Sequence, residues 1–316
     1  MKKIIISIAC IIIVGLSVAT IYYQKLPPLT LADAYPILRG HPDHDTTQNQ
    51  TQNEPKKIQP IYEQDNIGYA FQDHELYITF DNGSKWSTVP VEIDKLFGGE
   101  YNGAKDKLID GSFVLSNHNT SFIYLDGASH DNRQLAVVYT KDKGQTWQHV
   151  KLADVPSLRF RKIAFLNHSF GYMIVSTDRT MSAEATSVFL TYDGGENWQV
   201  TNQADTVTLI SDGAFLDEQV GFLSFSRINP EEPELYVTQD SGETWTFATF
   251  HIPETYDKVF TTAEVPQKDY NHLTVLVNQG PNGDYKGGQV KGAFISNDNG
   301  ETWEFAKEVE PDETIE

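Results

Sequence analysis

Short runs of alternating apolar and polar residues recur along most of this chain, from about residue 57 to about residue 310. They are rich in Val, Ile, Tyr, Phe and Thr, and this alternation is typical of half-buried β-strands. The clearest runs come in pairs, as in KIAFLNHSFGYMIVS (162–176) and DGAFLDEQVGFLSFS (212–226). Long runs with helical periodicity do not occur in this part of the sequence. The pattern therefore predicts an all-β fold.

Five polar segments interrupt the alternation, and each lies between two strand-like runs. They are TFDNGSKW (79–86), TKDKGQTW (140–147), TYDGGENW (191–198), TQDSGETW (238–245) and SNDNGETW (296–303). Asp-x-Gly between two strands predicts a hairpin turn, because glycine adopts positive φ at little cost and the carboxylate accepts hydrogen bonds from turn N–H groups. The tryptophan that ends each segment is large enough to wedge between neighbouring hairpins.

These five segments, the boxes, favour a structural role, because a catalytic group is usually needed only once. The residues to which we assign that role are Asp81, Gly83, Trp86, Asp142, Gly144, Trp147, Asp193, Gly195, Trp198, Asp240, Gly242, Trp245, Asp298, Gly300 and Trp303. The repeat length of about 50 residues is typical of repeated supersecondary units. Two strands followed by a box hairpin make four antiparallel strands, the blade of a β-propeller. Five blades are expected, and residues 92–111 leave room for a sixth.

This pattern resembles the BNR or Asp-box repeat, Ser/Thr-x-Asp-x-Gly-x-Thr-Trp, of sialidase-like β-propellers. It also looks like the propellers of the photosystem II assembly factor family and of sortilin-type receptors. The resemblance covers roughly residues 57–310, although Lys85 and Asn197 stand where the repeat usually has Thr. It implies the propeller fold but no single function, because the family includes enzymes, receptors and assembly factors.

The N-terminal residues 1–23 have the pattern of a membrane anchor. Positions 4–23 carry no charge and are long enough to cross a bilayer as a helix. Two lysines precede this run, which favours a cytoplasmic N-terminus, and two tyrosines close it, where aromatic residues at a membrane interface are favoured. We expect a single-pass protein of the cell membrane, with the propeller (57–316) outside and a flexible Pro/Gln/Asn/Thr-rich tether (24–56) between them.

Two other readings of the N-terminus stay open. Ser17 and Ala19 would suit a signal peptidase, and cleavage there would give a secreted protein. Lipidation would require Cys10, which lies inside the apolar run and is the only cysteine of the chain.

The composition and short polar motifs of the chain bear on whether it binds nucleic acid, a metal or a cofactor. The chain has 24 basic and 44 acidic residues and a net charge of −20, so we expect no nucleic-acid partner. The cluster HPDHD (41–45) lies in the expected tether, where metal ligands would not be preorganised. The fifth box departs from the spacing of a calcium loop and is interpreted as a turn. We therefore expect neither a metal nor a cofactor.

The resemblance raises the question of sialidase chemistry, which would need several arginines around a substrate carboxylate, a tyrosine–carboxylate pair and an aspartate acid/base. Arg39 is the only arginine before the first box and none follows Arg227, so the family's catalytic residues cannot be carried over to this sequence. We expect a monomeric, non-catalytic module that binds a cell-surface glycan, a cell-wall polymer or a protein.

Ligand binding is expected on the long loops between the second and third strands of each blade, at the end opposite the boxes. Arg133, Arg179 and Arg227 lie in equivalent loops of blades 2 to 4 and would suit an anionic group. Three residues of the fifth loop would close over it: Asp284, Tyr285 and Lys286. In the rival interpretation each arginine pairs with an acid beside it: Asp131, Asp178 or Glu231.

An enzymatic alternative remains, a divergent glycoside hydrolase or lyase. Its candidate carboxylates are Asp131, Glu232 and Asp284, all in these loops. Two carboxylates facing one pocket about 5–10 Å apart would favour the enzyme, and scattered carboxylates the binding module. Three histidines, His118, His168 and His251, are isolated along the sequence.

Overall fold

The computed structural model describes residues 58–64, 66–127, 132–180, 183–269 and 271–311. The expected anchor (1–23) and tether (24–56) lie outside the described residues. The chain from Lys57 onward forms a compact unit of its own. Within the described ranges, no helix is long and apolar enough to span a membrane.

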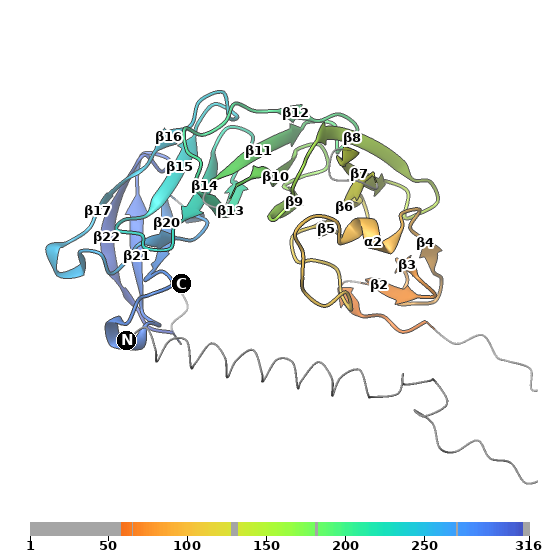
Figure 1. The fold of residues 1–316 in the computed structure, drawn as a ribbon, viewed down its shortest axis with the longest axis horizontal. Coiled ribbons are helices and arrows are strands. Elements are labelled where there is room, and N and C mark those ends of the chain that lie inside the picture. Colours follow the sequence, from red (N-terminus) through yellow and green to blue (C-terminus); the bar gives the residue numbers. More distant parts are fainter. Residues whose placement is uncertain (1–57, 65, 128–131, 181–182, 270, 312–316) are drawn as a thin grey trace, which may run out of the picture. The chain divides into compact units, whose positions relative to one another are not determined.

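The described strands form five sheets that follow one another in chain order (Figure 1). Blade 1 contains β1 (Tyr62–Gln64), β2 (Ile67–Gln72), β3 (Glu75–Thr79) and β4 (Ser87–Thr88). Blade 2 contains β5 (Phe113–Val114), β6 (Thr120–Asp126), β7 (Gln134–Thr140) and β8 (Gln148–Asp154). Blade 3 contains β9 (Arg161–Phe165), β10 (Gly171–Arg179), β11 (Glu184–Thr191) and β12 (Gln199–Val200). Blade 4 contains β13 (Leu209–Phe215), β14 (Gly221–Ser226), β15 (Glu234–Thr238) and β16 (Thr246–Phe247).

Blade 5 is larger than the others. It contains β18 (Thr262–Ala263), β19 (Gln267–Asp269), β20 (His272–Asn278), β21 (Lys291–Ser296) and β22 (Thr302–Val309), with β17 (Thr249–His251) at its outer edge. β17 pairs with β22 in parallel, with Thr249 opposite Thr302. The strand pairs inside blades 1 to 4 are antiparallel, as the repeat pattern predicts.

The first strands β5, β9 and β13 lie on the inner side of the arc of blades, and the fourth strands β12 and β16 lie on its outer side (Figure 1). Consecutive blades pack face to face through apolar clusters. Ile123 of blade 2 and Met173 of blade 3, for example, share one cluster, and neither side chain is exposed. The interface between blades 4 and 5 is centred on Phe222, Phe294 and Trp303, all fully buried.

The middle strands differ from the half-buried strands that the alternation predicts. In β6 and β10, six consecutive residues are buried. A blade in the middle of the arc has a neighbouring blade on each side, so both faces of its central strands are removed from water. Alternation survives where a strand is less enclosed, as in β20.

Residues 92–111, which left room for a sixth blade, contain the short helix α2 (Ile93–Leu96) and no strand. The described structure therefore has five blades.

The guanidinium of Arg161 connects the segment 92–111 to blade 3, because its Nη1 donates to the carbonyl oxygen of Leu96 at 3.1 Å. Arg161 is 4% exposed, and burial lowers its pKa to about 10.

Each box forms the turn between the third and fourth strands of its blade. In box 3, the Gly195 N–H donates to Thr191 Oγ1 at 2.8 Å, and the Asn197 N–H donates to Asp193 Oδ1 at 2.9 Å. The same two bonds recur in the other four boxes at 2.8–3.0 Å. Every box glycine has positive φ, between 76° and 95°. The repeated residues thus build one repeated turn.

Neighbouring boxes are also connected to each other. The Nζ of Lys141 in box 2 donates to the carbonyl oxygen of Asp193 at 2.7 Å and to Glu196 at 2.8 Å in box 3. Gln239 of box 4 makes the equivalent bonds to Asp298 and Glu301 of box 5, at 3.1 and 3.0 Å. In boxes 2 and 4, the residue between Thr and Asp therefore links its blade to the next one.

Candidate functional site

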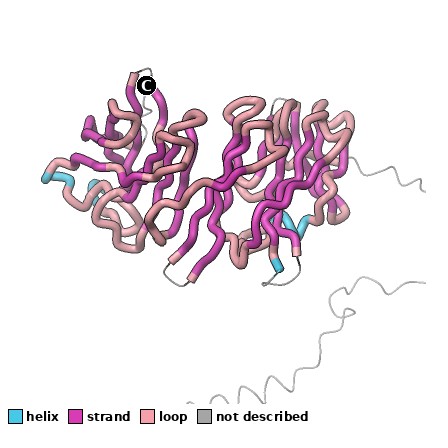
Figure 2. Tube along the Cα trace, turned by 90° about the horizontal axis from the view of Figure 1, so that it is seen from above, coloured by secondary structure: helices cyan, strands magenta, loops and turns pink. Residues whose placement is uncertain are grey.

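The loops gather at the two ends of the strands (Figure 2). Boxes and first-to-second-strand turns share one end, since Asn119 of such a turn donates to the Gly194 carbonyl at 2.7 Å. The second-to-third-strand loops lie at the opposite end, the loop end, because β10 and β11 are antiparallel neighbours. This arrangement agrees with the expectation from the repeat pattern.

The arginines expected at the loop end are placed there by the strands. Arg179 ends β10, Arg227 follows β14, and Arg133 precedes β7. Arg179 forms an ion pair with Glu100, and Arg227 pairs with Glu234 at 2.8 Å. Neither partner is the neighbouring acid that the rival interpretation named.

The neighbouring acids have other roles in the described structure. The Asp178 carboxylate accepts the Arg179 N–H at 2.8 Å, and Glu231 pairs with Lys258 at 3.3 Å. Asp131, which precedes Arg133 in the loop, lies outside the described residues. The candidate carboxylates Glu232 and Asp284 are exposed.

The fifth loop binds the last strand of its own blade. Tyr285 and Tyr256 donate hydrogen bonds to Glu308 at 2.8 and 2.7 Å, and Lys286 forms an ion pair with the same carboxylate. The Lys286 ammonium, followed by the two hydroxyls, lowers the pKa of Glu308 to about 2. Tyr285 and Lys286 therefore lie together as expected, but they bind Glu308 of the chain itself.

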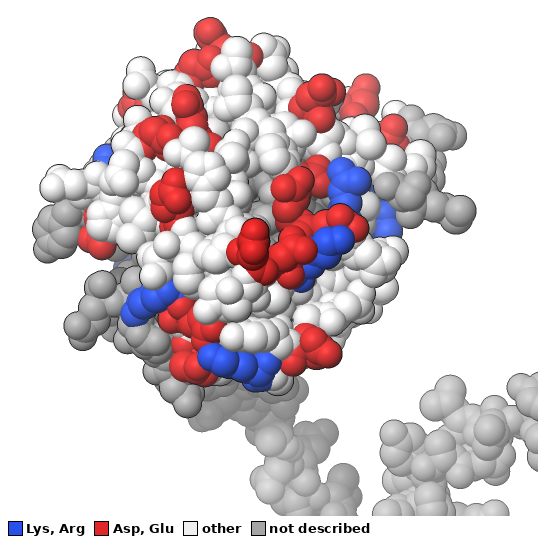
Figure 3. All heavy atoms as spheres, turned by 90° about the vertical axis from the view of Figure 1, so that its left-hand side faces the viewer, with Lys and Arg blue, Asp and Glu red and all other residues white. Residues whose placement is uncertain are grey.

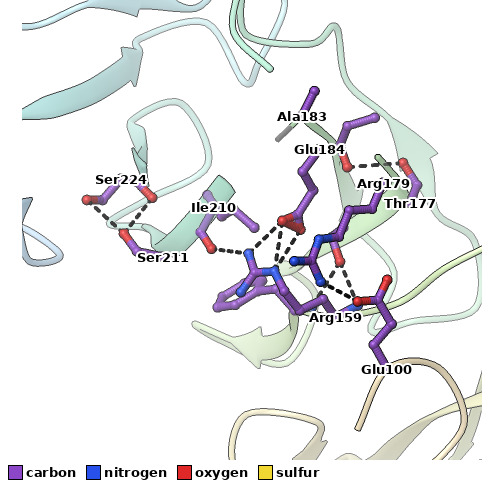
Figure 4. Close-up of polar contacts among 12 residues, drawn as sticks. Glu100, Arg159, Thr177, Arg179, Ala183, Glu184, Ile210, Ser211 and Ser224 are labelled. Atoms are coloured by element: carbon purple, nitrogen blue, oxygen red, sulfur yellow. Dashed lines mark hydrogen bonds and ion pairs between the residues drawn. The ribbon is translucent and has the colours of Figure 1, made fainter. Parts of the chain in front are cut away.

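A polar cluster lies near Arg179, between blades 3 and 4 (Figure 4). The Arg159 guanidinium donates to both oxygens of Glu184, with Nη2 at 2.7 Å, and to the Ile210 carbonyl at 2.5 Å. Glu184 is 1% exposed, so this ion pair satisfies a buried carboxylate at the loop end of β11.

A pocket of about 480 Å³ lies between the first strands of blades 4 and 5, and we call it the inner pocket. Its polar lining includes Ser211, Asp212, Glu264 and Asn278. Lys162 of β9 pairs with Asp212 at 2.6 Å. Lys291 and Asn278 bind Glu264 at 2.5 and 2.9 Å. Both carboxylates of the inner pocket therefore already accept an ammonium group of the chain.

The sequence did not single out the inner-pocket residues. Lys162 and Asp212 lie on the first strands of blades 3 and 4, within ordinary alternation of polar and apolar residues. Their contact exists only because β9 and β13 come close together in the fold.

Two histidines that are isolated in the sequence lie close together in the structure. His118 and His168 have ring centroids 4.2 Å apart on adjacent turns.

Acidic side chains are spread over the side of the molecule that Figure 3 shows, and most basic ones there lie beside them. Among the residues that the structure describes, no three His, Cys, Asp or Glu side chains are arranged to hold a metal ion. Several acidic side chains in the upper part of this view have no basic side chain beside them among the described residues.

Blades and boxes together define a β-propeller of the Asp-box kind. A family model described as BNR/Asp-box repeat matches residues 294–305, which is the fifth box with the ends of its two strands. The other four boxes have the same turn geometry. No curated protein has a sequence that matches this chain.

Several solved structures are similar to this chain at low identity. The GH74 xyloglucanase from Xanthomonas campestris is 17% identical, with a TM-score of 0.43 over 76% of this chain and 36% of that protein. The Hadza microbial sialidase Hz136 is 16% identical, with a TM-score of 0.38 over 76% of this chain and 52% of the sialidase. The Trypanosoma rangeli sialidase is 12% identical, with a TM-score of 0.35 over 74% and 44%. The chain thus spans about a third of the xyloglucanase and about half of each sialidase.

Proposed function

We propose that this protein is a non-catalytic binding or scaffolding module, held outside the cell by the apolar segment 4–23. The observation that carries the proposal is the pairing of arginines at the loop end: Arg159, Arg179 and Arg227 each bind a carboxylate of the chain itself. A sialidase-like site needs guanidinium groups that are free to receive a substrate carboxylate. These three shape the loops instead.

The ligand is a glycan, a cell-wall polymer or a protein that contacts the second-to-third-strand loops. Variable loops on rigid sheets suit recognition, because the sheets hold the loop ends while the loop sequences set the contacts. An anionic ligand would have to compete with Glu100 and Glu234 for Arg179 and Arg227. Arg133 remains a proposed contact as well.

The test is binding of the full chain to purified cell-wall polymer and to a glycan array. Arg133→Glu, Arg179→Glu and Arg227→Glu should each lower binding at least tenfold, since each adds negative charge to the contact surface. Lys143→Glu is the control, because Lys143 lies at the box end and is exposed. Lys141 would not serve, since it links box 2 to box 3. Equal binding by all four variants would remove the loop end as the binding surface.

The inner pocket favours a second candidate, a divergent glycoside hydrolase, because Asp212 and Glu264 line the same pocket. Such an enzyme would hydrolyse an aryl glycoside, and Asp212→Asn and Glu264→Gln would each abolish the activity. The non-catalytic proposal expects turnover below about 1 s⁻¹, the low end of ordinary enzymes, on aryl glycosides and on a fluorogenic sialoside. Turnover that both substitutions abolish would replace the first proposal by the second.

A further inference from the structure

A second pocket lies between blades 1 and 2, and we call it the side pocket. Its volume is about 390 Å³, within the range of roughly 300–1,000 Å³ that small-molecule sites occupy. Blade 1 contributes Glu75 and residues 88–92, and blade 2 contributes Tyr124, Asp126 and His149. The ammonium group of Lys95, from α2, completes the lining.

One wall holds a fixed pair of polar side chains. The Tyr124 hydroxyl lies 2.9 Å from His149 Nδ1, and the two rings are perpendicular, with centroids 5.8 Å apart. Tyr124 is 5% exposed, whereas His149 is exposed. The buried tyrosine therefore orients an accessible imidazole, whose Nε2 is left to meet a ligand.

The charged groups of the side pocket include both a hydrogen-bond donor and hydrogen-bond acceptors. Lys95 Nζ lies 3.2 Å from Glu92 and 3.1 Å from Asp126. The second oxygen of Asp126 lies 3.7 Å from Lys151. An ammonium donor and a carboxylate acceptor thus stand side by side, held by an ion-pair network.

An apolar patch and the balance of charges in the side pocket further limit the chemical class of ligand that it can bind. The exposed Pro90 and the half-buried Val91 form this patch on the wall of blade 1, whereas Val89 is buried in the core. Three carboxylates, those of Glu75, Glu92 and Asp126, line the pocket, against the ammonium group of Lys95 and that of Lys151 beside Asp126. This excess of negative charge repels sialic acid, sulfate and phosphate groups.

We infer that the side pocket binds an uncharged sugar residue. A sugar ring has C–H faces that suit the patch of Pro90 and Val91. Its hydroxyls donate and accept, so neighbouring hydroxyls can bridge Asp126 and Lys95 at once. The inference rests on the proposed binding function and deepens it by naming the ligand class. Asp126 ends β6 and Glu75 begins β3, so the side pocket adjoins the second-to-third-strand loops of blades 1 and 2.

The test titrates the full chain with methyl glycosides of neutral hexoses, with N-acetylglucosamine and with N-acetylneuraminic acid. Proton NMR of the His149 imidazole, identified with a His149→Gln variant, should show a saturable shift with at least one neutral sugar and none with N-acetylneuraminic acid. The His251 signal, from an imidazole paired with Glu304 in blade 5, should not move. This readout uses the wild-type protein and so does not depend on the folding of a variant.

Affinity is then compared by isothermal titration calorimetry. Asp126→Asn should weaken binding of the neutral sugar at least tenfold, and Tyr124→Phe several-fold, because the phenyl ring keeps the packing but no longer orients His149. Asp110→Asn, the matched control, alters a surface acid that pairs with Lys107 and should leave affinity unchanged.

No shift of His149 with any neutral sugar would overturn the inference, as would equal affinity of the Asp126→Asn and control proteins. Polymer binding that survives Asp126→Asn but is lost with the loop variants would overturn the side pocket alone. Failure to bind any polymer or glycan would instead remove the proposed binding function.

Discussion

A single aspartate oxygen organises each box turn, and the residue four positions later decides how completely the carboxylate is used. In box 2, Asp142 Oδ2 accepts the Thr146 hydroxyl at 2.6 Å. Asn197 replaces that hydroxyl in box 3, with its amide 2.8 Å from Asp193 Oδ2. The Lys85 side chain has no hydroxyl or amide to offer to Asp81 Oδ2. The carboxylate of Asp81 is bonded through Oδ1, which accepts the Lys85 N–H at 2.8 Å and the Thr79 hydroxyl at 3.0 Å. The amide is therefore a functional replacement for Thr, whereas the lysine is not.

Lys85→Thr should stabilise the protein by about 0.5–1.5 kcal/mol, because it adds the missing hydroxyl bond to Asp81. The reverse change in box 2, Thr146→Lys, should destabilise by a similar amount. Urea unfolding followed by tryptophan fluorescence measures both. A Lys85→Thr protein no more stable than wild type would show that the second carboxylate oxygen contributes nothing to the turn.

Acid should weaken the fold through the same carboxylates. The Thr146 hydroxyl and N–H lower the pKa of Asp142 from 3.8 to about 2. A lowered folded-state pKa gives stability that is present above the unfolded-state value and lost as pH falls through the folded-state value. The urea midpoint should therefore fall between about pH 4 and pH 2, and less steeply in Asp142→Asn than in Asp110→Asn. Parallel curves for the two variants would contradict this.

At the level of elements, the five box tryptophans anchor their hairpins unequally. Trp303 is fully buried between blades 4 and 5, whereas Trp198 is only partly buried between blades 2 and 3. Trp303 Nε1 donates to its own box glycine at 3.0 Å. Trp147 Nε1 is buried without a hydrogen-bond partner among the described residues. All five boxes end in tryptophan, but the packing around each blade sets how much its tryptophan contributes to stability.

Trp303→Ala should cost about 3–5 kcal/mol, the usual range for removing a buried tryptophan. Trp198→Ala should cost about 2 kcal/mol, since less of its surface is removed from water. Thermal and urea unfolding of the two variants decide the order. Equal losses would mean that burial does not control the contribution of these anchors.

At the scale of the whole molecule, the order of the blades follows the chain. Box residues connect blade 2 to blade 3 through Lys141 and blade 4 to blade 5 through Gln239. The boxes lie at one end of the strands, and the second-to-third-strand loops lie at the other end. The proposed location depends on residues 4–23, which the described structure does not include.

Protease treatment of intact cells should release the propeller, because we propose that the domain lies outside a membrane anchor. Mass spectrometry of the untreated protein should find Met1 or Lys2 at the N-terminus. A mature chain that begins at Thr20 would instead support signal-peptide cleavage.

The sequence by itself determined the all-β class, the repeat and the turns, because a box is a local structure: Thr191, Asp193 and Gly195 bond within five residues of one another. Tertiary structure alone decided which side chains meet across blades. Lys162 and Asp212, 50 positions apart, pair only because β9 and β13 converge. Tyr124 and His149, 25 positions apart, meet across β7. The Arg179 guanidinium likewise pairs with Glu100 rather than with the neighbouring Asp178. Local bonds follow from spacing along the chain, whereas the contacts that shape the pockets follow from how the sheets pack.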